Sequence, residues 1–287
     1  MRRFLPFLLI LLCSACATQE AHYTDKTPAD ATARDLLNHA DYEGAAGEYL
    51  RLANAHPQQA ISFQLQAVDA YLEAGKLTAA SSLLDETSRF LDNSHDRFQH
   101  ALLTAKLALF RDEAQRALFL TGGSVPADSP APLQSLRHDI RAMAYEYLGN
   151  YTSAIHERVM LQTLPATTII RERNTGRLWR DLGKLPLSEL EQLARDSSAD
   201  LRSWIELAVI SKTLMPRPER LRQALSLWEN QYPAHPAIPA ITSKLLTLSE
   251  QLNIRPQTVA LLLPFNGPYK KISEAIRDGF LTAWFEQ

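Results

Sequence analysis

The amino-acid sequence predicts a mainly α-helical protein in which pairs of helices stack into a repeat solenoid. Its 287 residues include 46 Leu and 38 Ala but only 5 Val and 10 Gly, a composition that favours packed helices over strands and Gly-rich turns. Between Thr32 and Leu252 the apolar residues recur at helical spacing, with only short breaks. The formal charge of −2 gives no electrostatic reason to bind nucleic acid, so we expect no such partner.

Residues 1–15 have the pattern of a secretory signal peptide. Arg2 and Arg3 precede an apolar run over Phe4–Leu12, and small residues follow it. This run has nine residues, whereas a membrane-spanning helix needs about 20, so its length excludes a transmembrane helix. Cys13 and Cys16 could instead form a redox or metal pair, but such a pair belongs in a folded domain.

The end of this segment resembles the lipobox of bacterial lipoproteins, in which a signal peptidase cuts before an acylated cysteine. The resemblance implies that Cys16 is the first mature residue and carries lipid, although Cys13 stands where Leu is usual. Ala17 follows, and in that family a residue other than Asp at this position implies sorting to the outer membrane. Residues 16–31 are polar and contain Pro28, so we expect a lipidated tether that reaches roughly 50 Å when extended.

Residues 32–255 carry a degenerate repeat that is typical of tetratricopeptide-like helix pairs. Gly75 and Gly44 stand in surroundings similar to those of Gly149, and Gly183 repeats the pattern 34 residues after Gly149. We expect each Gly to let the chain turn between two helices. The gap of 74 residues from Gly75 to Gly149 allows two units and an inserted loop; an irregular helical bundle is the alternative. The clearest unit is Ala144-x-x-Tyr147-Leu148-Gly149-x-Tyr151-x-x-Ala154.

One segment within this region, Thr121–Pro132, concentrates Gly, Ser and Pro. This composition predicts an exposed connector between two helices. A phosphate-binding loop is a weaker interpretation, because the segment lacks the Lys and the strand-to-helix setting that such a loop needs.

The pattern changes after Pro256. The continuous apolar run Thr258–Pro264 predicts a strand of a sheet that is covered on both faces, and Lys270–Phe285 predicts a helix. A strand, a turn and a helix open a βαβ unit, so residues 256–287 are interpreted as the truncated start of an α/β domain. We favour a fragment of a longer protein over a tail that packs on the solenoid.

These pieces together resemble the LpoA family of lipoprotein activators of penicillin-binding proteins, over nearly all of the chain. The resemblance implies that the repeat domain is followed by a domain similar to type I periplasmic solute-binding proteins, whose first strand and helix match Val259–Phe285. Its most specific motifs are Trp228-x-x-Gln231-Tyr232-Pro233-x-His235-Pro236-Ala237 and Ala260-Leu261-Leu262-Leu263-Pro264-x-x-Gly267.

The same resemblance implies a regulator of peptidoglycan synthesis. Such a protein is anchored in the outer-membrane lipid through Cys16 and faces the periplasm. It binds a bifunctional class A penicillin-binding protein and stimulates its transpeptidase activity. In that family the synthase contact is attributed to the C-terminal domain, of which this chain holds only the start.

We expect no catalytic, cofactor-binding or metal-binding site, and therefore no enzyme activity. No Gly-x-Ser-x-Gly elbow occurs, and His156-Glu157 lacks the second His of the zinc-protease pattern. Adjacent His and Asp residues on predicted helices point in different directions, so we expect each His to pair with a local carboxylate and to form no dyad. These neighbours are His95-Asp96 and His138-Asp139.

Three alternative functions remain open. A solenoid lytic transglycosylase would carry a catalytic Glu followed by Ser, but Ser follows none of the Glu residues here. A solute-binding sensor would need a cleft between two α/β lobes, and neither lobe is complete. A repeat scaffold would use aromatic residues as partner contacts, although we expect these to lie in the solenoid core: Tyr42, Tyr147, Tyr151 and Trp228.

Overall fold

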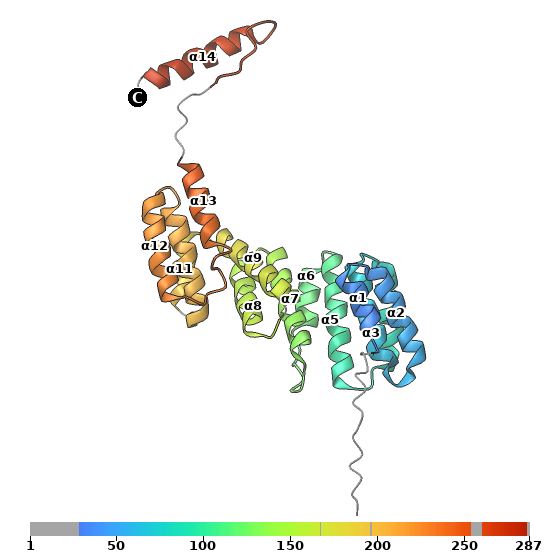
Figure 1. Ribbon diagram of the computed structural model, residues 1–287. Coiled ribbons are helices and arrows are strands. Elements are labelled where there is room, and N and C mark those ends of the chain that lie inside the picture. Colours follow the sequence, from blue (N-terminus) through green and yellow to red (C-terminus); the bar gives the residue numbers. More distant parts are fainter. Residues whose placement is uncertain (1–28, 167, 196, 254–259, 286–287) are drawn as a thin grey trace, which may run out of the picture. The chain divides into compact units, whose positions relative to one another are not determined.

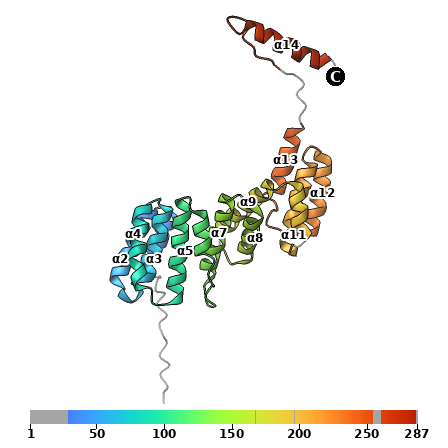
Figure 2. The same ribbon diagram turned by 180° about the vertical axis from the view of Figure 1, so that it is seen from behind.

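The computed structural model describes residues 29–166, 168–195, 197–253 and 260–285. Within these ranges every regular element is a helix, which confirms the mainly α prediction (Figures 1 and 2). The chain forms two compact units, with the division after Arg111.

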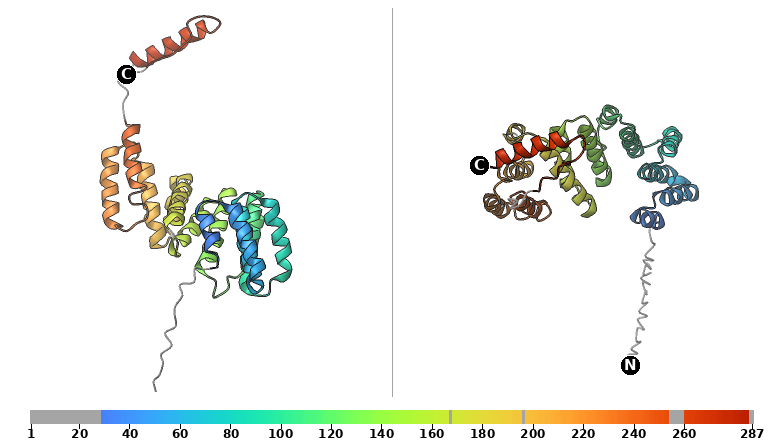
Figure 3. Two further views of the ribbon diagram at one scale, coloured as in Figure 1. Left: turned by 45° about the vertical axis from the view of Figure 1, so that its right-hand side comes forward. Right: turned by 90° about the horizontal axis from the view of Figure 1, so that it is seen from above.

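In the first unit each α-helix packs on the next, and α3 also contacts α5. Contact between helices that are two apart along the chain is what a stack of helix pairs requires. Figure 3 shows helices of this unit nearly end-on and side by side. The described elements are α1 (Ala31–Asn38), α2 (Tyr42–Ala55), η1 (Pro57–Gln59), α3 (Ala60–Glu73), α4 (Leu77–Thr87), η2 (Ser88–Phe90) and α5 (Ser94–Phe110).

Buried alanines and aromatic rings fill the interior of the first unit. The alanines let α2 and α3 approach closely, and the rings of Tyr49 and Phe63 stack with centroids 6.5 Å apart. At the edge of this core, the ammonium group of Lys106 on α5 lies 2.5 Å from a carboxylate oxygen of Asp69 and of Glu73 on α3. These two ion pairs therefore join α3 to α5, which also contact each other.

In the second unit helices α6 to α9 pack each on the next, as do α10 to α13, and α11 also contacts α8 and α9. The described elements are α6 (Ala114–Leu120), α7 (Ala131–Tyr147), α8 (Tyr151–Thr163), α9 (Thr168–Lys184), α10 (Leu187–Arg195), α11 (Ala199–Leu214), α12 (Pro218–Gln231), α13 (Thr242–Leu252) and α14 (Lys270–Phe285). The chain between α6 and α7 has no regular structure, so the predicted connector over Thr121–Pro132 is confirmed for residues 121–130.

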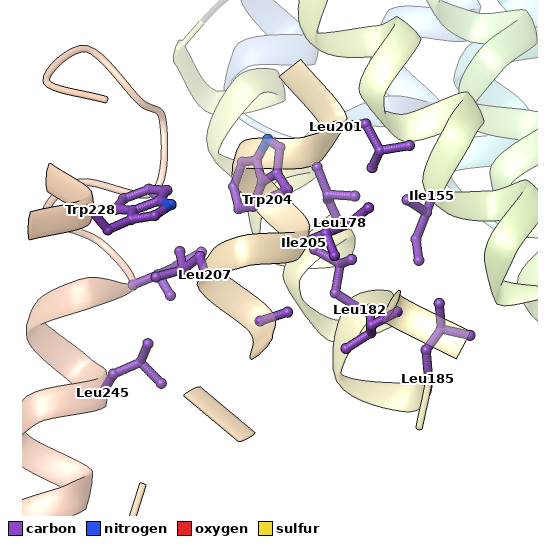
Figure 4. Close-up of a cluster of buried hydrophobic side chains, with 14 of the residues drawn as sticks. Ile155, Leu178, Leu182, Leu185, Leu201, Trp204, Ile205, Leu207, Trp228 and Leu245 are labelled. Atoms are coloured by element: carbon purple, nitrogen blue, oxygen red, sulfur yellow. The ribbon is translucent and has the colours of Figure 1, made fainter. Parts of the chain in front are cut away.

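The core of the second unit centres on α11. Trp204 and Ile205 are buried there, and Leu178 and Leu182 of α9 lie beside them (Figure 4). Trp228 of α12 covers the other side of the same cluster. One continuous apolar cluster thus joins α8 to α13.

Short turns between consecutive helices contain four of the five described residues with positive φ, the fifth being Gly267 before α14. The four are Ala40 (58°), Gly75 (70°), Asp112 (60°) and Gly149 (71°), which are 35, 37 and 37 residues apart. At Ala40, Gly75 and Gly149 the amide donates to the carbonyl three residues earlier, and the following amide donates to the carbonyl five residues earlier. This is the Schellman motif that ends helices. A repeat close to the tetratricopeptide period of 34 is therefore present.

Two of the predicted turn glycines lie elsewhere. Gly44 is in the first turn of α2, where its amide donates to the Asp41 side chain at 2.9 Å. Gly183 is inside α9, which continues to Lys184. The 34-residue spacing between Gly149 and Gly183 therefore does not join two equivalent turns. The prediction failed because Gly can also occur within a helix. At the first turn Ala40, and not Gly44, takes the left-handed conformation.

The C-terminal segment confirms the predicted helix, since α14 spans Lys270–Phe285. The predicted strand is not formed, because residues 260–264 have no regular structure, while Thr258 and Val259 lie outside the described residues. A strand is held by hydrogen bonds to a neighbouring strand, and the described residues contain none. The proposed limits of the helical and α/β domains stay predictions.

The predicted signal peptide, Cys16 and nearly all of the tether lie outside the described residues. Over the part of the chain that is described, no helix combines the length and apolar character that crossing a membrane requires.

Candidate functional site: a charged network across α7, α8 and α9

A fully buried arginine lies between three consecutive helices of the second unit. Arg158 on α8 has no exposed side-chain surface. Ile155 and Val159 of the same helix belong to the apolar core. At helical spacing residue 158 lies on the same side of α8 as these two residues, so its side chain also enters the interior. Burial of a charge is costly unless the charge is paired and hydrogen-bonded.

Acidic residues from both neighbouring helices satisfy this arginine. From α7, Glu146 accepts from its Nε at 2.7 Å and also from a terminal nitrogen, and Asp139 accepts at 3.2 Å. From α9, Asp181 accepts from Nε at 3.1 Å and the Asn174 amide oxygen accepts at 3.3 Å. One guanidinium group therefore connects α7, α8 and α9.

The network holds more negative than positive charge. Three carboxylates face Arg158, and within the described residues the only other cation bonded to them is Arg177, whose terminal nitrogen lies 3.4 Å from Asp139. Burial, and then the nearby Glu146 carboxylate, raises the pKa of Asp181 to about 7. Asp181 is only 2 % exposed, so near neutral pH it holds a proton for part of the time.

A second network lies next to the first, because Glu157 precedes Arg158 on α8. Its carboxylate accepts from Nδ1 of His138 at 2.7 Å and from Nε of Arg141 at 2.6 Å. Burial alone would raise the pKa of Glu157, but these two donors outweigh it and hold the pKa below its usual range.

The predicted separation of His138 and Asp139 is confirmed. Asp139 contacts Arg158 and Arg177, whereas the partner of His138 is Glu157, which comes from the next helix rather than from its own. Sequence reasoning expected a local surface carboxylate and so missed this link between α7 and α8. It also missed Arg158, for which the only signal was a charged residue within the apolar face of a helix.

These networks are suited to holding helices together. His138 bonds to Glu157, and within the described residues no hydroxyl or thiol is hydrogen-bonded to its ring. The described residues also contain no group of three or more His, Cys, Asp or Glu side chains that could hold a metal ion.

The Trp228–Ala237 motif builds an aromatic cluster at the other end of the second unit. The ring of His235 lies edge-on to those of Trp204 and Trp228, with centroids 4.4 and 4.6 Å away. Its Nδ1 accepts from the Ala237 amide at 3.1 Å, while its buried Nε2 has no partner within the described residues. Burial lowers the pKa of His235 to about 4, so the ring is neutral at pH 7.

The aromatic residues predicted for the core divide into two groups. Trp228 is buried, and Tyr151 packs against the core of the second unit while partly buried. Tyr42 is partly buried. The prediction is wrong for Tyr147, whose position at the C-terminal end of α7 leaves it 59 % exposed. Tyr147 borders a surface pocket of about 470 Å³ that Asp112, Arg116 and Leu148 also line.

Comparisons with solved structures agree with this fold. The N-terminal domain of LpoA from Haemophilus influenzae has a TM-score of 0.62 and 20% identity, with 71% of this chain and 94% of that chain covered. The amino-terminal domain of Escherichia coli LpoA has a TM-score of 0.61 and 18% identity, with 72% and 95% covered. These likenesses show the fold.

Sequence comparisons show the family. Two relatives are named penicillin-binding protein activator LpoA. The relative from Glaesserella parasuis is 28% identical over 96% of this chain and 46% of its own length, and that from Photobacterium profundum is 25% identical over 99% and 45%. The chain thus spans less than half the length of these relatives. A model of the LppC lipoprotein family matches residues 41–287, so the chain belongs to this family and the resemblance to LpoA is confirmed.

Proposed function

We propose that this protein is part of a regulator that activates a penicillin-binding protein. The observation that carries the proposal is the family match over residues 41–287, together with relatives that are named for this activity. A regulator rather than an enzyme also agrees with the names of these relatives, which describe an activator.

The partner in this proposal is a bifunctional class A synthase of the inner membrane, and the regulator binds it directly. A stack of helix pairs can present an extended surface to such a partner. In this proposal, binding of the regulator to the synthase stimulates the transpeptidase activity of the synthase.

A purified assay tests this function. The full-length protein is mixed with its cognate class A synthase and lipid-linked substrate, and cross-linked muropeptides are measured after digestion. We expect more cross-linking than with the synthase alone and no release of fragments from isolated sacculi. Unchanged cross-linking would contradict the activator function, and soluble muropeptides released by the protein alone would favour a lytic transglycosylase.

We further propose that the protein is held in the outer membrane by lipid on Cys16. Several acyl chains on one cysteine would make attachment effectively permanent, whereas a single chain binds marginally. The supporting observations are the lipobox-like sequence and membership of a lipoprotein family.

Substitution of the two cysteines separates this anchor from other roles of a thiol. Cys16→Ala is expected to abolish labelling with radioactive palmitate and to release the protein into the periplasmic fraction. The matched control Cys13→Ala should keep both the label and sedimentation with outer membranes. Equal labelling of the two variants would contradict an anchor at Cys16.

A further inference from the structure

Two arginines on one face of α7 are fixed at their inner ends. Arg137 and Arg141 are one helical turn apart, which places their Cβ atoms about 6 Å from each other. Nε of Arg137 donates to the Thr121 carbonyl at 2.9 Å, and Nε of Arg141 donates to Glu157 at 2.6 Å. Each guanidinium group is therefore oriented by a bond at Nε.

The outer ends of both guanidinium groups remain available. The terminal nitrogens of Arg137 have no partner within the described residues, and those of Arg141 contact only the Tyr145 hydroxyl, at 3.2 Å. Both terminal nitrogens of Arg137 and Nη1 of Arg141 lack a partner in the described part of the chain and are not among the buried atoms, so they reach solvent. The side chain of Arg141 is only 18 % exposed, so it lies close against the protein surface and does not protrude.

Positive charge exceeds negative charge at these two arginines. The groups that act on Arg137 are Arg141, Tyr145 and the Glu157 carboxylate, which also accepts from Arg141 and His138. One carboxylate thus faces two guanidinium groups. Burial, and then the nearby charge of Arg141, lowers the pKa of Arg137. An anion beside both groups would relieve this repulsion.

We propose that Arg137, Arg141 and Tyr145 form a binding site for the side-chain carboxylates of an acidic peptide segment. Guanidinium groups that are held at Nε present two parallel donors, a geometry that matches a carboxylate. From Arg137 to Tyr145 the stripe covers eight steps of helix, or about 12 Å, which is the length of about four residues of extended peptide. This site is independent of the identity of any synthase.

A peptide fits this stripe better than a membrane surface does. The side chain of Arg141 is mostly buried, and Tyr145 adds an aromatic ring whose centroid is 5.6 Å from the Arg141 guanidinium carbon. A narrow segment can follow such a stripe, whereas a flat layer of lipid headgroups would contact protruding cations first.

Fluorescence anisotropy tests the proposal with the full chain in detergent. The probes are a fluorescein-labelled peptide of alternating Glu and Ala and a matched peptide of alternating Gln and Ala. We expect the Glu peptide to bind at least about tenfold more tightly. Arg137→Gln should weaken this binding by about tenfold, and Arg141→Lys should also weaken it because Lys lacks the planar fork. The control Arg220→Gln, at an exposed position on α12, should leave binding unchanged.

Three results would overturn the assignment. One is equal affinity for the Glu and Gln peptides, and another is full affinity of Arg137→Gln for the Glu peptide. The third is retention on phosphatidylglycerol vesicles that Arg137→Gln abolishes, without any peptide binding. Far-UV circular dichroism of each variant confirms that the helices remain, and Arg137→Gln leaves the Arg141–Glu157 pair in place.

Discussion

At the scale of single residues, Arg158 shows how a charge can be buried without being a site of reaction. Its donors meet carboxylates on α7 and α9, so its removal would leave Glu146 and Asp181 without a counter-ion in the interior. Loss of one partner from a buried ion pair costs far more than the pair itself contributes, because the remaining charge stays desolvated.

We therefore expect Arg158→Leu to lower the free energy of unfolding by about 3–5 kcal/mol. The matched change Arg177→Leu removes an arginine whose side chain is 26 % exposed and has one 3.4 Å contact to Asp139, and it should cost less than about 1 kcal/mol. Urea denaturation followed by circular dichroism compares the two. Similar losses of unfolding free energy in both variants would show that the buried contacts of Arg158 stabilise the protein no more than the single contact of Arg177 does.

The second residue whose environment matters is His235, which the aromatic cluster keeps neutral. Its pKa of about 4 in the folded protein lies below its ordinary value of 6.5. Between pH 4 and pH 6.5 the imidazole of His235 therefore binds a proton more readily in the unfolded chain than in the folded protein. Stability from the neutral ring is fully present above pH 6.5 and is lost as the pH falls through 4.

We expect the wild-type protein to lose up to about 3 kcal/mol between pH 6.5 and pH 4 relative to His235→Asn. Asn does not titrate, and its amide oxygen can replace Nδ1 as the acceptor for the Ala237 amide. The measurement is the difference in unfolding free energy between the two proteins across this pH range. A constant difference would rule out His235 as the titrating group.

At the scale of elements, the sequence predicted helices more reliably than the turns between them. The helix over Lys270–Phe285 was predictable from its apolar period. The turn at Asp112 was not, because a non-Gly residue holds the left-handed conformation there. Backbone preferences indicate which residue types adopt a turn most easily. The packing of the two helices decides which residue occupies the turn.

The charged network shows the same limit. Asp139 and Glu146 are seven residues apart on α7, and so are Asn174 and Asp181 on α9, so the sequence places each pair on one helical face. Nothing in the local pattern says that both faces meet at Arg158. That meeting depends on how α7, α8 and α9 pack.

Two glycines provide a matched test of turn and helix. Gly149 has φ of +71°, whereas Gly176 lies within α9, and an added Cβ would meet nothing within 4 Å at either position. We expect Gly149→Ala to destabilise the protein by about 1–2 kcal/mol through backbone strain, and Gly176→Ala to stabilise it by about 0.5–1 kcal/mol. Urea midpoints report both changes. A stabilising Gly149→Ala would contradict the left-handed turn.

At the scale of the whole molecule, the two compact units have separate apolar cores. Stability in stacked repeats is close to a sum of local terms and nearest-neighbour terms. A buried side chain in one unit should therefore affect the other unit only weakly, and effects of distant substitutions should add.

Val68→Ala on α3 and Ile205→Val on α11 test this additivity, because both side chains are almost fully buried and lie in different units. We expect losses of about 2 and about 1 kcal/mol from the methyl groups removed. The double variant should lose their sum to within about 0.5 kcal/mol. Hydrogen exchange should place faster amide exchange in α3 for the first variant and in α11 for the second. A larger coupling, or faster exchange throughout the chain in either variant, would mean that the two units unfold as one cooperative body.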